Sequence, residues 1–187
     1  ENYKTVLEKM LVEKLKLKNH SAMTESEEKR VLNDFNDTDI AYPQNECIHH
    51  LFEKQAEQNP DRTAVIACDQ TLTYIQLNEL ANRIAHSLID RGINKGDIIA
   101  VALPRKSYLI ASLFGVLKTG AAYVPIDPEY PKERIEYIIN DSGAKLLISA
   151  ENIDDLLKHS EIGNPEVDVL CEDLCYSIYT SGTTGNP

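Results

Sequence analysis

Apolar residues from position 46 onward alternate between short continuous runs and longer stripes at helical spacing. The short runs predict strands at residues 63–68, 98–103, 122–126 and 145–149, and a last strand that ends over residues 177–180. The stripes predict helices at residues 48–58, 73–91, 107–119, 131–139 and 152–158. Strands that alternate with helices indicate βαβ units, so we expect an α/β fold with a mostly parallel sheet flanked by helices.

Several polar residues, glycines and prolines predict where these helices begin and end. Thr73 followed by Gln76 is a capping-box pattern, and it opens the long helix that Gly92 should close. Gly120 is placed to cap the helix over residues 107–119. Pro131 suits the first turn of the next helix, where a missing N–H costs nothing, and Ser142-Gly143 should stop that helix.

Residues 1–45 follow a different pattern. Apolar residues recur at helical spacing over residues 3–17, with lysines and glutamates between them. Thr24 and Glu27 form a second capping-box pattern before a short helix, and residues 33–39 have the composition of a turn and linker. We therefore expect a helical linker over residues 1–45, followed by the α/β region over residues 46–187.

The charge of the chain excludes some function classes. The 187 residues include 19 Lys and Arg and 30 Asp and Glu, which gives a net charge of −11. Duplex DNA binding needs basic residues that neutralise phosphates, so no nucleic acid partner is expected. The uncharged apolar stretch at residues 107–117 is too short for a bilayer, which needs roughly 20 residues. Without a signal peptide pattern, we expect a cytoplasmic protein with no membrane partner.

The cysteine and histidine pattern does not predict a metal site. The four cysteines contain no Cys-x-x-Cys pair and are too few for a disulfide framework, so we interpret them as reduced thiols. A metal pair of Cys171 and Cys175 lacks a further Cys or a His nearby in sequence. The His49–His50 pair is expected on the surface of a helix. The cysteines are Cys47, Cys68, Cys171 and Cys175.

A loop rich in glycine and hydroxyl residues follows the last predicted strand. Its glycines let successive N–H groups converge on an anion, and its hydroxyls add neutral donors. Such a loop can hold phosphate oxygens even in an acidic protein, although a flexible surface loop would have the same composition. The Walker A pattern is absent. The candidate phosphate-binding residues are Thr180, Ser181, Gly182, Thr183, Thr184 and Gly185.

Three motifs give this loop a family context. Residues 179–187, YTSGTTGNP, closely resemble the phosphate-binding loop of the adenylate-forming superfamily. Residues 72–78, LTYIQLN, resemble an early motif of its nonribosomal peptide synthetase branch, with Gln76 where Glu is usual. Residues 117–128, LKTGAAYVPIDP, resemble the next motif of that branch, with Thr119 where Ala is commoner. The order and spacing of the three motifs indicate an adenylation domain.

The resemblance implies an ATP-dependent, AMP-forming ligase. Such a domain binds an amino acid and Mg-ATP, forms an aminoacyl-adenylate, and transfers the acyl group to the phosphopantetheine of a carrier protein. The loop from Thr180 to Gly185 would hold the β- and γ-phosphates, and the substrate carboxylate needs no general base. The family's other catalytic and specificity motifs lie beyond residue 187, so we expect no catalytic residue or metal ligand in this chain and no adenylation activity from it alone.

The resemblance also suggests neighbouring domains and leaves alternatives open. Residues 24–45 are similar to the linker after an upstream condensation domain, and residues 1–20 to the last helix of that domain. An acyl-CoA synthetase of the same superfamily and a non-catalytic docking module are the two alternatives. Residues 121–128 and the linker-like residues favour the peptide synthetase branch. The amino acid itself is not indicated.

Overall fold

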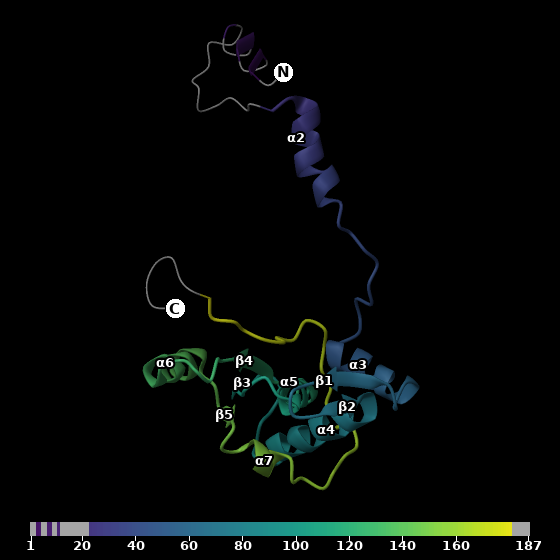
Figure 1. Cartoon of the computed structure of the whole chain (residues 1–187), viewed down its shortest axis with the longest axis vertical. Coiled ribbons are helices and arrows are strands. Elements are labelled where there is room, and N and C mark those ends of the chain that lie inside the picture. Colours follow the sequence, from purple (N-terminus) through teal and green to yellow (C-terminus); the bar gives the residue numbers. More distant parts are fainter. Residues whose placement is uncertain (1–2, 5–6, 9–10, 12–22, 181–187) are drawn as a thin grey trace. The chain divides into compact units, whose positions relative to one another are not determined.

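The computed structural model describes residues 3–4, 7–8, 11 and 23–180 and divides into two units, Glu1–Pro43 and Gln44–Pro187 (Figure 1). The first unit holds α2 (Glu25–Leu32) and a short 3-10 helix, η2 (Asp34–Asn36). The capping box of α2 is confirmed, because the Thr24 N–H donates to the Glu27 carboxylate at 2.9 Å and the Thr24 hydroxyl accepts from the Glu27 N–H. The described residues among positions 3–11 are helical, as expected. No helix in the described part of the chain is long and apolar enough to cross a bilayer.

The second unit is built around a three-stranded parallel sheet. Its strands are β3 (Ile98–Ala102), β4 (Ala122–Pro125) and β5 (Leu146–Ser149), in the order β4-β3-β5. Ile99 pairs with Tyr123 on one side and with Leu146 on the other. The α/β class and the parallel sheet are therefore confirmed.

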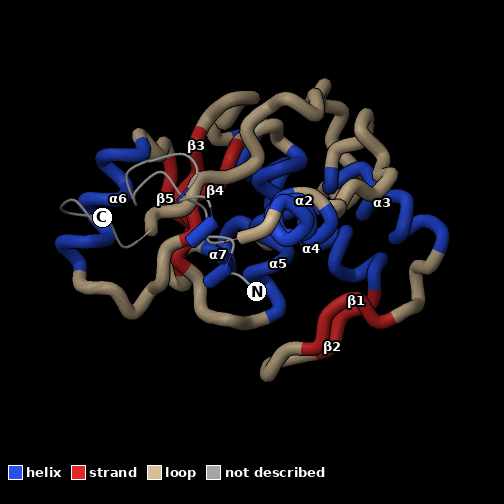
Figure 2. The backbone as a smooth tube through the Cα atoms, turned by 90° about the horizontal axis from the view of Figure 1, so that it is seen from above, coloured by secondary structure: helices blue, strands red, loops and turns tan. Residues whose placement is uncertain are grey.

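Helices cover both faces of this sheet (Figure 2). On one face, Ala100 and Ala102 pack with α6, and on the other, Ile99 and Val101 belong to a larger core with α4 and α5. All four side chains are buried, which explains why β3 is apolar at every position. The helices are α3 (Ile48–Gln58), α4 (Tyr74–Asp90), α5 (Ser107–Lys118), α6 (Lys132–Ser142) and α7 (Ile153–Leu156).

A β-hairpin lies apart from the parallel sheet. Its strands, β1 (Thr63–Ile66) and β2 (Thr71–Thr73), are antiparallel. In the turn between them, the Asp69 carboxylate accepts from the N–H of Ser107 at 3.1 Å and from its hydroxyl at 2.7 Å. These hydrogen bonds with Ser107 lower the pKa of the Asp69 carboxyl. Since Ser107 is the first residue of α5, the hairpin caps that helix.

The predicted helix boundaries agree with the structure to within one residue except at α6 and α7, and α7 spans Ile153–Leu156 rather than residues 152–158. The Thr73–Gln76 capping box opens α4, and Gly92 and Gly120 adopt the left-handed conformation that ends α4 and α5. Pro131 is the residue before α6 rather than part of its first turn. That helix continues past residue 139 to Ser142, and the expected stop at Ser142-Gly143 is confirmed, because Gly143 adopts the left-handed conformation that ends the helix.

The expected last strand at residues 177–180 is wrong. The chain makes a single parallel bridge, in which the Tyr123 N–H donates to the Cys175 carbonyl and the Ser177 N–H donates to the Tyr123 carbonyl. The next donor along β4 in a parallel ladder would be residue 125. Pro125 has no N–H, so the ladder stops after one step.

The two long helices α4 and α5 pack closely at a glycine. A Cβ atom built at Gly115 would lie 2.7 Å from the Ile84 Cγ2 atom and 3.0 Å from the Ala81 carbonyl oxygen. Ile84 and Ala81 are both fully buried. Gly115 is therefore required by the close approach of the two helices rather than by backbone conformation.

A buried ammonium group connects three helices. The Lys118 side chain is 0% exposed, forms an ion pair with Glu53 of α3, and donates to the Asn164 side-chain oxygen at 3.0 Å. The same oxygen accepts from Asn78 and Asn82 of α4 at 2.9 and 3.0 Å. Burial lowers the pKa of Lys118, and the ion pair with Glu53 opposes that effect. We call these five residues the Lys118 cluster.

We predict that Gly115→Ala destabilises the chain. Alanine favours a helix over glycine by about 1 kcal/mol, but the clash with Ile84 should lower the free energy of unfolding by about 1–3 kcal/mol. Urea unfolding followed by circular dichroism measures the change. The matched control is Gly163→Ala, where the nearest atom is a flexible Glu161 carboxylate oxygen at 3.3 Å, and its effect should stay within about 0.5 kcal/mol. Equal stability of the two variants would contradict the prediction.

We predict that Glu53→Gln costs about 3–5 kcal/mol of unfolding free energy at pH 7, because it leaves the Lys118 ammonium buried without a counter-charge. The double variant Glu53→Gln/Lys118→Met removes both charges and should recover much of this loss. Urea unfolding of both variants and wild type measures these differences.

The loss in Glu53→Gln should also depend on pH. Without Glu53, the folded-state pKa of Lys118 should fall further below its ordinary value of 10.5, so the unfolded chain binds more protons between the two pKa values. The stability of Glu53→Gln relative to the double variant should therefore rise as the pH increases toward 10. A difference that stays constant over this range would be the contrary result.

Candidate functional site

The candidate phosphate-binding loop begins where the described residues end. Thr180 is exposed at this point, whereas Ser181, Gly182, Thr183, Thr184 and Gly185 lie outside the described residues. The structure therefore defines how the chain reaches the loop. This part of the chain is the connecting segment, residues 157–180, which contains no helix or regular strand (Figure 1).

The first half of the connecting segment is held on α4 by hydrogen bonds to its backbone carbonyl groups. Side chains of α4 donate to consecutive parts of the segment, so an irregular backbone acquires hydrogen bonds that it could not make within a helix or sheet. The Asn82 amide group donates to the Ile162 carbonyl at 2.7 Å and the Arg83 guanidinium donates to the His159 carbonyl at 2.5 Å. The Lys118 cluster then fixes Asn164.

The middle of the connecting segment is held by Lys95. Its ammonium group donates to the Asp168 carbonyl at 3.0 Å and forms an ion pair with the Asp173 carboxylate at 2.7 Å. Asp173 also accepts a hydrogen bond from the N–H of Leu170, three residues earlier, at 2.6 Å. The hydrogen bond from Lys95, followed by that from Leu170, lowers the pKa of Asp173. These contacts lead the chain to the free edge of β4.

At that edge the connecting segment runs parallel to β4. The Tyr176 and Tyr123 rings stack with their centroids 5.7 Å apart, beside the two backbone hydrogen bonds of the single bridge. Open α/β sheets bind ligands beyond the carboxyl ends of their parallel strands. The direction of the bridge at Tyr176 therefore suits a segment that delivers a ligand-binding loop.

The last residue before Thr180 is anchored on α6. The Tyr179 hydroxyl donates to the Asp141 carboxylate at 2.5 Å, and its ring meets Tyr137 edge-on at 6.5 Å between centroids. Burial, together with Asp141, raises the pKa of Tyr179 to about 12, so its hydroxyl stays a donor at neutral pH. The backbone that opens the loop is thus fixed by a side chain immediately before it.

A pocket lies at the carboxyl ends of β3 and β4. Its volume is about 430 Å³, and its charged lining residues are Arg105, Asp127 and Glu129. Asp127 accepts from the Glu129 N–H at 2.9 Å, which makes it a turn residue. One cation with two acids gives this pocket no positive charge, so phosphate binding near it would depend on neutral N–H and O–H donors such as those of the loop.

Two features of the helices around the connecting segment are not predicted by the sequence pattern. The first is the buried contact between Lys118 and Asn164. The sequence signal for Lys118 was a lysine directly after the apolar residues of α5. The second is the position of His49, which was expected on a helix surface but is only 4% exposed. Burial, followed by the charges of His50 and Lys118, lowers the pKa of His49 to about 4, so its imidazole is neutral at pH 7.

Comparison with curated proteins finds close relatives among very large synthetases. The chain is 41% identical to gramicidin S synthase 2 of Brevibacillus brevis over 92% of this chain, and 43% identical to bacitracin synthase 1 of Bacillus licheniformis over 88% of it. The matched regions make up only 4% and 3% of those two proteins. The chain therefore corresponds to a small part of each relative.

Comparison with solved structures and family models agrees with this result. The nonribosomal peptide synthetase FmoA3, in a form with bound α-methyl-L-serine-AMP, superposes with a TM-score of 0.76 and 26% identity, covering 86% of this chain and 20% of that one. The model of the AMP-binding enzyme family matches residues 52–187. Since this match includes well over half of the residues, the chain belongs to the family of AMP-binding enzymes.

Proposed function

We propose that residues 46–187 form the N-terminal part of a nonribosomal peptide synthetase adenylation domain. The reaction would join an amino acid to the AMP part of ATP with release of pyrophosphate. Support comes from the relatives at 41% and 43% identity, which are peptide synthetases, and from a related synthetase structure with an amino acid adenylate bound. The observation that carries the proposal is the YTSGTTGNP motif, whose first residue, Tyr179, donates a hydrogen bond to Asp141 of α6 beside the parallel sheet.

In this proposal the loop from Thr180 to Gly185 holds the β- and γ-phosphates of ATP. Its N–H and hydroxyl groups would stabilise negative charge that develops on the leaving pyrophosphate. The amino acid carboxylate is already a nucleophile, so binding and orientation replace a general base. This role suits an acidic chain, because neutral donors do not require a basic patch.

Magnesium would accompany ATP rather than occupy a site in the described residues. Mg²⁺ prefers carboxylate, phosphate and water oxygens. Within residues 23–180, the group of three close ligand atoms comes from Cys47, His49 and His50, which is a poor donor set for this ion. We therefore propose that Mg²⁺ is bound mainly through the phosphates of ATP.

The proposed domain would work with other domains. The adenylate would be transferred to the phosphopantetheine thiol of a carrier protein, and residues 1–45 would form the helical linker after a condensation domain. The synthetase relatives are long enough to contain both partners, since this chain matches only 4% and 3% of their lengths. A cytoplasmic location fits this role.

An acyl-CoA synthetase remains the alternative within the same family. A substrate panel on the polypeptide that contains this chain distinguishes the two. Amino-acid-dependent exchange of pyrophosphate into ATP is expected. Activity with fatty acids and coenzyme A alone would favour the alternative, and activity with neither substrate class would favour a docking module.

We predict that Thr180→Val in that polypeptide lowers the rate of amino-acid-dependent pyrophosphate exchange on the order of 10- to 100-fold, because the variant loses one donor to the phosphates. Gly182→Val should have a larger effect, since it also blocks the close approach of the backbone to the phosphates. The matched control is Thr71→Val, at an exposed position on β2, which should retain the wild-type rate. Unchanged exchange in Thr180→Val and Gly182→Val would refute the role of the loop.

A further inference from the structure

A cluster of sulfur and nitrogen atoms lies at the start of α3, outside the site proposed for ATP. One possible ligand atom from each of Cys47, His49 and His50 lies within 4.8 Å of the others. The Cys171 Sγ atom of the connecting segment lies 3.8 Å from the Cys47 Sγ atom. The fold thus brings together side chains that are 124 positions apart in sequence.

The distance between the two sulfur atoms fits a shared metal ion. Zinc binds thiolates at about 2.3 Å, so two sulfurs on adjacent corners of a tetrahedron are roughly 3.8 Å apart. Two cysteines and two histidines are also a common ligand set of structural zinc sites. We propose that Cys47, His49, His50 and Cys171 form a binding site for a soft divalent cation of the Zn²⁺ class.

The surroundings of the cluster allow such a site. A pocket of about 210 Å³ adjoins the cluster. Its lining residues include Glu46, Cys47, His49, Cys171 and Asp173. Two thiolates would balance the charge of a divalent ion. The nearby Lys118 ammonium is already paired with Glu53. The burial of His49 holds its ring in place. Cys171 is exposed and lies outside the group of three close ligand atoms, so in this proposal a change of its side-chain rotamer completes the coordination.

The ion would fasten the connecting segment to α3. Cys171 lies between Asp168 and Asp173, which Lys95 binds, and it precedes the Tyr176 bridge to β4. A metal bond at this position would add a strong link to contacts that are otherwise hydrogen bonds and ion pairs. This site takes no part in the proposed adenylation chemistry, so its test is independent of that function.

Cobalt substitution tests the site directly. The full chain, without a polyhistidine tag, is reduced with a phosphine, stripped of metal by a chelator, and titrated with Co²⁺. We expect one equivalent to bind with a thiolate-to-cobalt charge-transfer band in the near ultraviolet and intense visible bands typical of four-coordinate cobalt. Zn²⁺ should displace it and raise the Tm of the chain, because a ligand that binds the folded state stabilises it.

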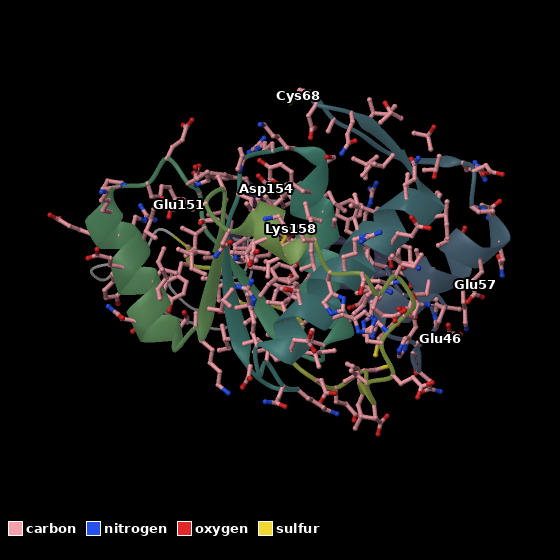
Figure 3. All side chains as sticks on the ribbon, turned by 90° about the horizontal axis from the view of Figure 1, so that it is seen from below. Glu46, Glu57, Cys68, Glu151, Asp154 and Lys158 are labelled. Carbon is pink, nitrogen blue, oxygen red and sulfur yellow. The ribbon has the colours of Figure 1, made fainter. Side chains whose placement is uncertain are left out.

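Variants show which cysteines bind the metal. Cys47→Ser and Cys171→Ser should each weaken Co²⁺ binding by at least about 10-fold and lose charge-transfer intensity. Because Cys171 is exposed, its variant should fold normally, which circular dichroism verifies. The matched control is Cys68→Ser, which should bind like wild type. Figure 3 shows Cys68 on the hairpin, well apart from Glu46 at the pocket.

Three results would overturn the proposal. The first is a reduced chain that binds Co²⁺ without a thiolate band. The second is a Cys171→Ser variant that binds Co²⁺ as tightly as wild type. The third is a chain that forms a Cys47–Cys171 disulfide in air but binds no cobalt when reduced.

Discussion

The buried ammonium group of Lys118 constrains how the helices of the second unit pack. A charge removed from water is tolerated only when a counter-charge and hydrogen-bond acceptors surround it. Glu53 supplies the first from α3, and Asn164 supplies an acceptor from the connecting segment. The requirement to satisfy one cation therefore fixes the relative positions of α3, α5 and an irregular stretch of backbone.

The position of the connecting segment follows from that constraint. Once Asn164 is held, the chain on either side of it lies within reach of α4 and Lys95, whose side chains bind its carbonyl groups. The segment then needs only one bridge to β4 and the Tyr179–Asp141 hydrogen bond to bring Thr180 to its place. Polar anchors thus do the positioning that a longer strand would do in a regular sheet.

The proposed adenylation function and the proposed metal site depend on this segment in different ways. The proposed phosphate-binding loop follows the end of this segment, after Tyr179, and would act through backbone and hydroxyl donors. The proposed metal site includes Cys171, in the middle of the segment, and would act by fixing the segment on α3. One irregular stretch of chain would therefore link the proposed chemistry of the loop to the packing of the helices.

The amino-acid sequence is sufficient to predict the α/β class, both capping boxes and the order of the elements as far as α7, except for β2 and η2. It also contains the YTSGTTGNP motif. These are local features, because helical spacing and side-chain caps involve residues only three or four positions apart. The family resemblance also depended on short contiguous motifs, and the family match agrees with it.

Tertiary structure alone decided the burial of His49, the role of Lys118, the length of the last strand and the meeting of Cys47 with Cys171. Pro125, which stops the bridge at β4, is visible in the sequence, but the pairing of Tyr176 with Tyr123 is not. Each of these features joins residues more than 50 positions apart or depends on which residues bury a side chain. Local spacing cannot specify such contacts, because they arise only when helices and strands pack around a shared core.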